Sequence, residues 1–297
     1  MKTLEKAKQE RGESGAKTKG DRLPALSIDA VGINEHCTGS RWAAADADHL
    51  ARIIAIVAMG QAAHAARIIA ELLPSEPAVD DNALRIDAKR RLSVRGKTDQ
   101  KREASRYHRD GLIFETISWI AAQQSTTGKA LIRDPHLSST SQGLDGLMIE
   151  LDESGAAIAH TTIFEDKCSE HPRDKFRDEI MPAFKAHHEN RRASELVSTA
   201  AALIGKIGLD GTAATKAAAR VLDRTCRIYR GGLAVTTEYD TQARRKSLFK
   251  NYEGLQGIKP DQRIGATLIT SDDLRGWFDE LANRAIAYID SAEIGED

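Results

Sequence analysis

Hydrophobic positions in the first half of the chain predict helices. In residues 43–73, apolar side chains recur at helical spacing in two groups, which predicts two helices separated or bent at Gly60 and ended by Pro74. Residues 110–123 are a further helix candidate, and we expect it to be buried on more than one side because its apolar residues cover most of the circumference. Residues 80–109 show weak periodicity and are expected to form a charged connector.

A β-hairpin is the clearest pattern in the second half of the chain. Residues 147–151 predict one strand, residues 152–155 carry turn-forming side chains, and residues 156–164 predict the returning strand. A Gly-Gly pair at 231–232 in the next strand predicts a bulge or bend, and the polar helix end at 187–188 predicts two solvated histidines. The remaining expected elements are helices near 176–184, 194–204, 212–224 and 271–289, and strands within 226–238 and 266–269.

Composition indicates a globular protein of the cytoplasm. The chain has 297 residues, enough for one elaborated domain or two, and its 41% hydrophobic and 29% charged content argues against disorder throughout. No apolar run is long enough to span a bilayer, and the charged N-terminus does not resemble a secretory signal. Three scattered cysteines form neither a disulfide framework nor a zinc motif, which fits a reducing compartment.

Charge is segregated along the chain although the total is close to zero. The net charge of −1 excludes the strongly basic field of a histone-like protein. Residues 85–110 nevertheless carry ten Lys or Arg against four Asp or Glu, and residues 241–263 carry six against two. Each run fits either a local phosphate-binding surface or a solvated helix face or linker. We expect a partner protein or oligomerisation to supply part of any nucleic-acid affinity.

Four residues of the hairpin carry the candidate chemistry. Side chains of a strand alternate between faces, so Glu165 and Lys167 should point the same way and Asp166 the other way. A turn centred near residues 153–155 places Glu165 opposite a residue around 141–145, which brings Asp145 within reach. One face would then present two carboxylates and an ammonium group.

Two neighbouring carboxylates repel each other unless a cation or a proton lies between them. Mg²⁺ or Mn²⁺ would resolve the repulsion between Asp145 and Glu165, and Lys167 could hold the attacking water or neutralise charge in the transition state. The pattern therefore predicts metal-assisted phosphodiester hydrolysis. Glu115, a carboxylate in an apolar helix, needs a partner. It is either a further acidic member of this site or a rim residue, exposed or paired with an arginine.

Together these residues resemble the PD-(D/E)XK nuclease superfamily over residues 108–190. The matching pieces are Glu115, Asp145 in GLDGLMIEL, and Glu165 and Lys167 in IFEDK; Leu144 stands where the family motif has its proline. The resemblance implies a restriction-endonuclease-like core, an α/β fold whose mixed sheet is flanked by helices. It also implies that the acidic side chains and the backbone carbonyl of Asp166 bind Mg²⁺, and that Lys167 assists the water.

The implied organisation has four parts: a mobile tail at 1–25, a helical N-terminal region at 26–105, a nuclease-like core at 106–240 and a C-terminal helical region at 241–297. The chain is also similar to nuclease subunits of bacterial antiphage defence systems, including the Hachiman type. That similarity implies a DNA substrate and a helicase or other ATPase partner. The alternative is a non-catalytic nuclease-like module that binds a partner or senses a signal, with Lys167 in a closed ion pair rather than at an open cleft.

Overall fold

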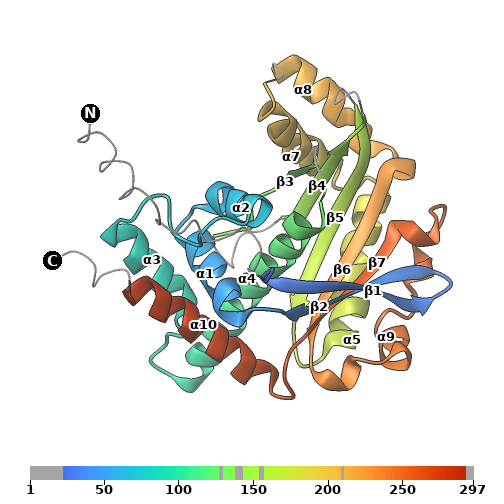
Figure 1. Cartoon of the computed structure of the whole chain (residues 1–297). Helices are drawn as coiled ribbons and strands as arrows, with labels where there is room; N and C mark the ends of the chain where they lie inside the picture. Colours follow the sequence, from blue (N-terminus) through green and yellow to red (C-terminus); the bar gives the residue numbers. More distant parts are fainter. Residues whose placement is uncertain (1–22, 127–129, 138–142, 154–156, 209–210, 292–297) are drawn as a thin grey trace, which may run out of the picture.

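A seven-stranded mixed sheet forms the centre of the molecule (Figure 1). The computed structural model describes residues 23–126, 130–137, 143–153, 157–208 and 211–291. The strand order is β1-β2-β7-β6-β5-β4-β3, with β2, β7, β6 and β5 parallel and the outer pairs antiparallel. The strands are β1 (Leu26–Asn34), β2 (Cys37–Ala44), β3 (Ala130–Ile132), β4 (Gly146–Leu151), β5 (Ile158–Cys168), β6 (Arg227–Val235) and β7 (Arg263–Ile269).

Helices cover both faces of the sheet, so the predicted α/β class with a flanked mixed sheet is confirmed (Figure 1). Successive residues of β5 point into opposite cores: Phe164 packs with the first helical layer and Ile163 with the second. The first layer contains α1 (Ala47–Ala58), α2 (Ala62–Glu71), α3 (Asn82–Leu92), α4 (Asp99–Ser125) and α10 (Leu274–Ser291). The second contains α5 (Pro172–Lys175), α6 (Met181–His188), α7 (Ala193–Gly205), α8 (Gly211–Ala218) and α9 (Gln242–Leu248).

The N-terminal and C-terminal regions that were predicted to be helical also contribute strands to the central sheet. β1 and β2 lie within residues 26–105, and β7 lies within residues 241–297. β1 is an edge strand in which only Leu26 and Ile33 are buried, so its sequence shows little alternation. Its place in the sheet depends on β2, which pairs with the distant β7. The sequence pattern did not predict β1 and β2, whereas β7 contains the strand predicted at 266–269.

The predicted charged connector at 80–109 is helical as well. Asp81 caps α3 by accepting from the backbone of Ala83 and Leu84, and Thr98 caps α4. The face that α3 buries contains an arginine, which weakens the apolar periodicity. The apolar segment at 110–123 is the second half of a helix that already begins at Asp99.

Several local predictions are confirmed. Gly60 adopts a positive φ of 81° between α1 and α2, and the β4–β5 hairpin forms, with β5 extending to Cys168. Residues 154–156 of the predicted turn and residues 1–22 of the predicted tail lie outside the described residues, whereas Ala25 is buried. Within the described ranges, no helix combines the length and the apolar character needed to cross a membrane.

Candidate active site

The hairpin register brings Asp145 and Glu165 together. Gly146 pairs with Phe164, so Asp145, one step earlier, lies opposite Glu165, one step later. The Asp145 Oδ2 atom accepts a hydrogen bond of 2.8 Å from the backbone N–H of Asp166 and one of 2.9 Å from Lys167 Nζ. The cross-strand approach that the hairpin pattern predicts is present.

The Lys167 ammonium group lies between the two carboxylates. Its Nζ is 2.9 Å from Asp145 Oδ2 and 3.7 Å from Glu165 Oε2. Burial alone would lower the pKa of Lys167, but the charges of Asp145 and Glu165 outweigh it and raise that pKa above its usual range. Lys167 therefore remains a cation in this arrangement.

Glu165 is almost completely buried, with 5% of its surface exposed and no hydrogen-bond partner for Oε1 among the described residues. Burial, and secondly the charge of Asp145, raise the pKa of Glu165 to about 8. A cation bound at this carboxylate would favour its charged form.

Asp166 points to the opposite face of the sheet, as strand alternation predicts. Burial raises its pKa to about 7 against the opposing effect of Arg230, and its Oδ1 has no hydrogen-bond partner within the described segments. Gly232 makes room for this side chain, because a methyl group at position 232 would overlap Asp166 Oδ1. Gly231 and Gly232 pair regularly with Glu165 and Asp166, so the predicted bulge or bend is absent there.

Sequence reasoning missed Arg230, a buried cation in β6 next to Asp166. Its guanidinium lies 3.6 Å from the centre of the Phe164 ring and 5.0 Å from that of Trp42, and it donates to Ser118 on α4. Burial lowers the pKa of Arg230 to about 10. The available signal was an arginine in the middle of β6, a largely apolar strand that also begins with Arg227.

Glu115 has a histidine partner, which sequence reasoning also missed. The Glu115 Oε1 atom accepts hydrogen bonds from the backbone N–H of His136 at 2.7 Å and from its Nδ1 at 2.8 Å. Because Arg133 can only donate to His136 Nε2, the ring proton is on Nδ1. Arg133 also donates to the carbonyl of Leu144, so this chain of hydrogen bonds connects α4 to the residue before Asp145.

A cleft of about 600 Å³ opens over this site. Asp145, Asp166, Lys167 of the hairpin and Glu115 of α4 are among its lining residues, whereas the buried Glu165 is not. Lys167 has one feature of each alternative. It is ion-paired, as expected for a non-catalytic module, but a quarter of its side chain is exposed at the cleft, as expected for a nuclease.

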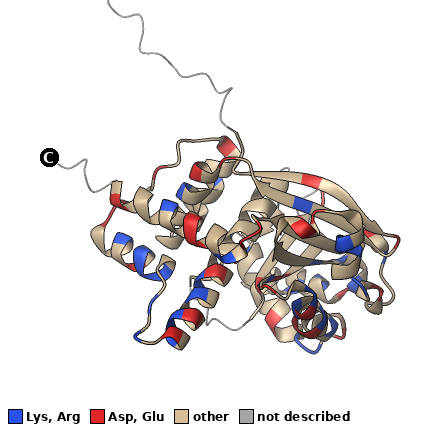
Figure 2. Ribbon diagram, turned by 90° about the horizontal axis from the view of Figure 1, so that it is seen from below, with Lys and Arg blue, Asp and Glu red and all other residues tan. Residues whose placement is uncertain are grey.

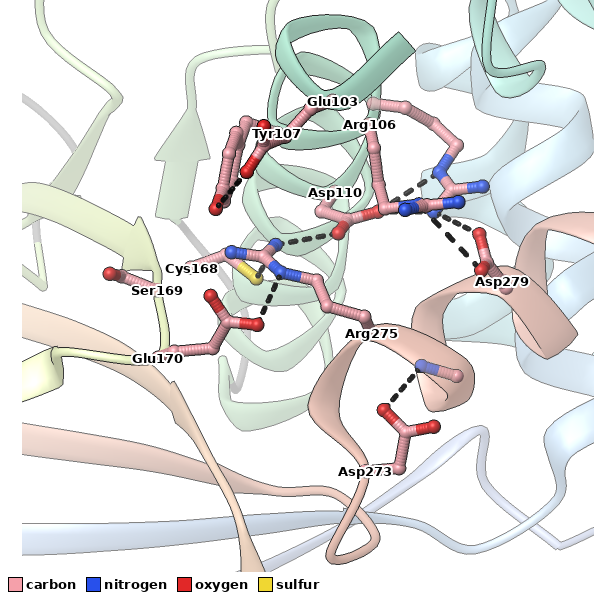
Figure 3. Close-up of polar contacts among 12 residues, drawn as sticks. Glu103, Arg106, Tyr107, Asp110, Cys168, Ser169, Glu170, Asp273, Arg275 and Asp279 are labelled. Atoms are coloured by element: carbon pink, nitrogen blue, oxygen red, sulfur yellow. Dashed lines mark hydrogen bonds and ion pairs between the residues drawn. The ribbon is translucent and has the colours of Figure 1, made fainter. Parts of the chain in front are cut away.

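Contacts of Arg275 on α10 hold the opposite wall of the cleft in place (Figure 3). Arg275 donates to the fully buried Asp110 at 2.6 Å, and its guanidinium lies 3.5 Å from Glu170 and 4.3 Å from the centre of the Tyr107 ring. Tyr107, Cys168 and Glu170 line the cleft, so this network fixes α4, α10 and the end of β5 around it.

The donor atoms fit a hard divalent cation in part. Among the residues that the structure describes, no three His, Cys, Asp or Glu side chains form a ready metal-binding group. Two carboxylates are nevertheless close together, and Glu165 Oε1 has no hydrogen-bond partner in the described ranges of the chain. In a strand, the N–H and C=O of one residue face the same neighbour, so the Asp166 carbonyl is directed toward Asp145. Two carboxylates, one carbonyl and waters suit Mg²⁺ once Lys167 moves aside.

His187 and His188 are buried rather than solvated. Neither ring nitrogen of His187 has a hydrogen-bond partner in the described part of the chain. Burial, followed by the charges of Arg192 and Arg227, lowers the pKa of His187 to about 4. His188 is held between the hydroxyl of Tyr229 and a backbone carbonyl.

Comparisons of the chain with protein families, with curated proteins and with solved structures found no match. The functional interpretation therefore depends on the geometry of the hairpin and the cleft.

Proposed function

We propose that this protein is a metal-dependent nuclease that hydrolyses phosphodiester bonds in DNA. The observation that carries the proposal is the position of Lys167 Nζ, within 2.9 Å of Asp145 and 3.7 Å of Glu165 at the edge of an open cleft. The antiparallel β4–β5 hairpin, continued by parallel β6 and flanked by α4 and α6, supports a restriction-endonuclease-like core.

Each residue of the site has a distinct role in this proposal. Asp145, Glu165 and the backbone carbonyl of Asp166 would hold Mg²⁺ or Mn²⁺, which supplies water activation and charge stabilisation when bound. Lys167, released from Asp145, orients the attacking water or neutralises charge developing on the phosphate. Glu115 is the further acidic residue at the cleft, and through His136 it positions the chain next to Asp145.

The biological setting is supported by the resemblance and by the cysteines. The resemblance to antiphage nuclease subunits supports DNA as substrate and a helicase or other ATPase as partner, with homo-oligomerisation as the other source of affinity. All three cysteines are free, in keeping with the cytoplasm.

A second candidate function is a non-catalytic nuclease-like module that binds a partner or senses a signal. It is favoured by the ion pairs of Lys167 and by the burial of Glu165. In this role the two carboxylates and the ammonium group are a structural network that needs no metal.

Cleavage and metal binding separate the two candidates. The purified full chain is incubated with supercoiled plasmid, linear DNA and single-stranded RNA in Mg²⁺, Mn²⁺ or EDTA, and Mn²⁺ binding is measured by calorimetry. A nuclease cleaves DNA with either metal and not in EDTA. A structural network gives neither cleavage nor Mn²⁺ binding, and cleavage of RNA alone would contradict the DNA assignment.

A further inference from the structure

A second cavity, of about 510 Å³, lies between α3 and α4. We call it the α3–α4 groove. None of its eleven lining residues is Asp or Glu, although the whole chain carries 44 Asp or Glu against 43 Lys or Arg. Its basic lining residues are Arg90, Arg91, Arg95, Lys101, His108 and Arg109. Lys and Arg positions recur along α3, the connecting segment and the first turns of α4 (Figure 2).

Two of these cations are available to a ligand. Arg90 and Arg91 are ion-paired with Asp87, and Arg109 is ion-paired with Asp110 and Asp279. Arg95 and Lys101 are exposed, and neither forms an ion pair with any described residue. The groove therefore keeps a net positive charge after its internal pairs are counted.

The connecting segment is held in a defined position against α4. The backbone N–H of Arg95 donates to Ser105 Oγ at 2.9 Å. Gly96 has a φ of 150°, and a methyl group there would lie 2.7 Å from the backbone of Lys101 and Arg102. This close packing fixes Arg95 and Lys101 on the same groove, so less freedom is lost when they bind an anion.

The α3–α4 groove lies next to the candidate active-site cleft. His108 and Leu112 of α4 line both spaces. An extended anion bound along α4 would pass from the basic groove to Lys167, Asp145 and Glu115.

We propose that the α3–α4 groove binds the phosphate backbone of the DNA strand that is cleaved, with Arg95 and Lys101 contacting phosphates outside the reacting one. This inference rests on the proposed nuclease function, since it names the path of that substrate. It also assigns a role to the basic run at 85–110, which lies outside the resemblance except for its last three residues.

Equilibrium binding without metal tests this proposal separately from catalysis. Fluorescence anisotropy in EDTA measures the affinity of two duplexes of unrelated sequence for the wild-type chain and for Arg95→Gln/Lys101→Gln. The matched control is Lys216→Gln/Arg220→Gln, which removes the same charge from exposed positions of and beside α8, at the far end of the molecule (Figure 1).

Loss of two phosphate contacts should weaken both duplexes equally and reduce the salt slope of log K by ~1.8, about 0.9 per contact. The control should keep the wild-type slope. An unchanged slope in Arg95→Gln/Lys101→Gln overturns the proposal even where the wild-type protein cleaves DNA. Tripolyphosphate binding is measured for the same two proteins. If Arg95→Gln/Lys101→Gln loses tripolyphosphate binding but keeps DNA binding, the groove binds a small polyphosphate and the proposal is also overturned. Failed cleavage with the expected slope change would contradict the nuclease function alone.

Discussion

The Lys167 ammonium and the Asp145 carboxylate form a 2.9 Å ion pair at the residue where the β4–β5 hairpin opens. The same ammonium lies 3.7 Å from Glu165, so one cation offsets two carboxylates that the register places opposite each other. Any ion that binds both carboxylates must replace Lys167 in this role.

Removing the Lys167 ammonium should make folding stability depend on divalent metal. In EDTA, Lys167→Met should lower the free energy of unfolding by about 2 kcal/mol, because it leaves two carboxylates facing each other. This is less than for a fully buried pair, since Glu165 can take up a proton. Millimolar Mg²⁺ should restore part of the loss, as measured by urea unfolding.

Lys206→Met is the matched control, because Lys206 pairs with Asp134 on the exposed surface and neither residue lines the cleft. Its effect should be below about 1 kcal/mol and independent of Mg²⁺. An equal loss in EDTA and Mg²⁺ for Lys167→Met would argue that the carboxylates bind no metal.

Gly232 should be intolerant of even a methyl group. Gly232→Ala forces Asp166 from its buried position beside Arg230, and we expect a loss of about 1–3 kcal/mol in the free energy of unfolding. Gly111→Ala, in the interior of α4 with open space around it, should instead stabilise the protein by about 0.5–1 kcal/mol. Chemical unfolding compares the two, and equal signs would contradict the packing described for Asp166.

His187 should make the fold sensitive to mild acid. Its pKa is about 4 in the folded state and 6.5 in a free side chain, so between these values the unfolded chain binds a proton that the folded chain does not. Stability therefore falls as pH falls, by about 2 kcal/mol between pH 7 and pH 5 from this group. In His187→Leu, urea unfolding at the two pH values should show a correspondingly smaller difference. The same difference as in the wild type would show that His187 is not the group responsible.

The hairpin and its acidic pair could be predicted from the sequence because both depend on local pattern. Alternation separates Glu165 from Asp166, and the turn position determines which residue lies opposite Glu165. These two facts are contained in about twenty consecutive residues.

The partners of the site could not be predicted because they come from distant segments. Arg230 approaches Asp166 only because β6 pairs in parallel with β5, a connection of more than fifty residues. His136 reaches Glu115 only after β3 and α4 pack together. β1 and β2 could not be predicted for the same reason, because β2 joins the sheet by pairing with β7, which is distant in the sequence.

The most direct test of the nuclease assignment is the rate of plasmid cleavage in Mg²⁺ by Glu165→Gln and by Glu150→Gln, each checked for folding by circular dichroism. Both substitutions replace one carboxylate of the same hairpin by an amide, but Glu150 lies opposite His160 in the strand register and does not line the cleft. We expect Glu165→Gln to lower the rate at least ~100-fold, because loss even of groups that only support a metal ligand lowers activity 10- to 100-fold. Glu150→Gln should cleave at close to the wild-type rate. Equal, metal-dependent cleavage by both variants would contradict the placement of the active site at Asp145, Glu165 and Lys167.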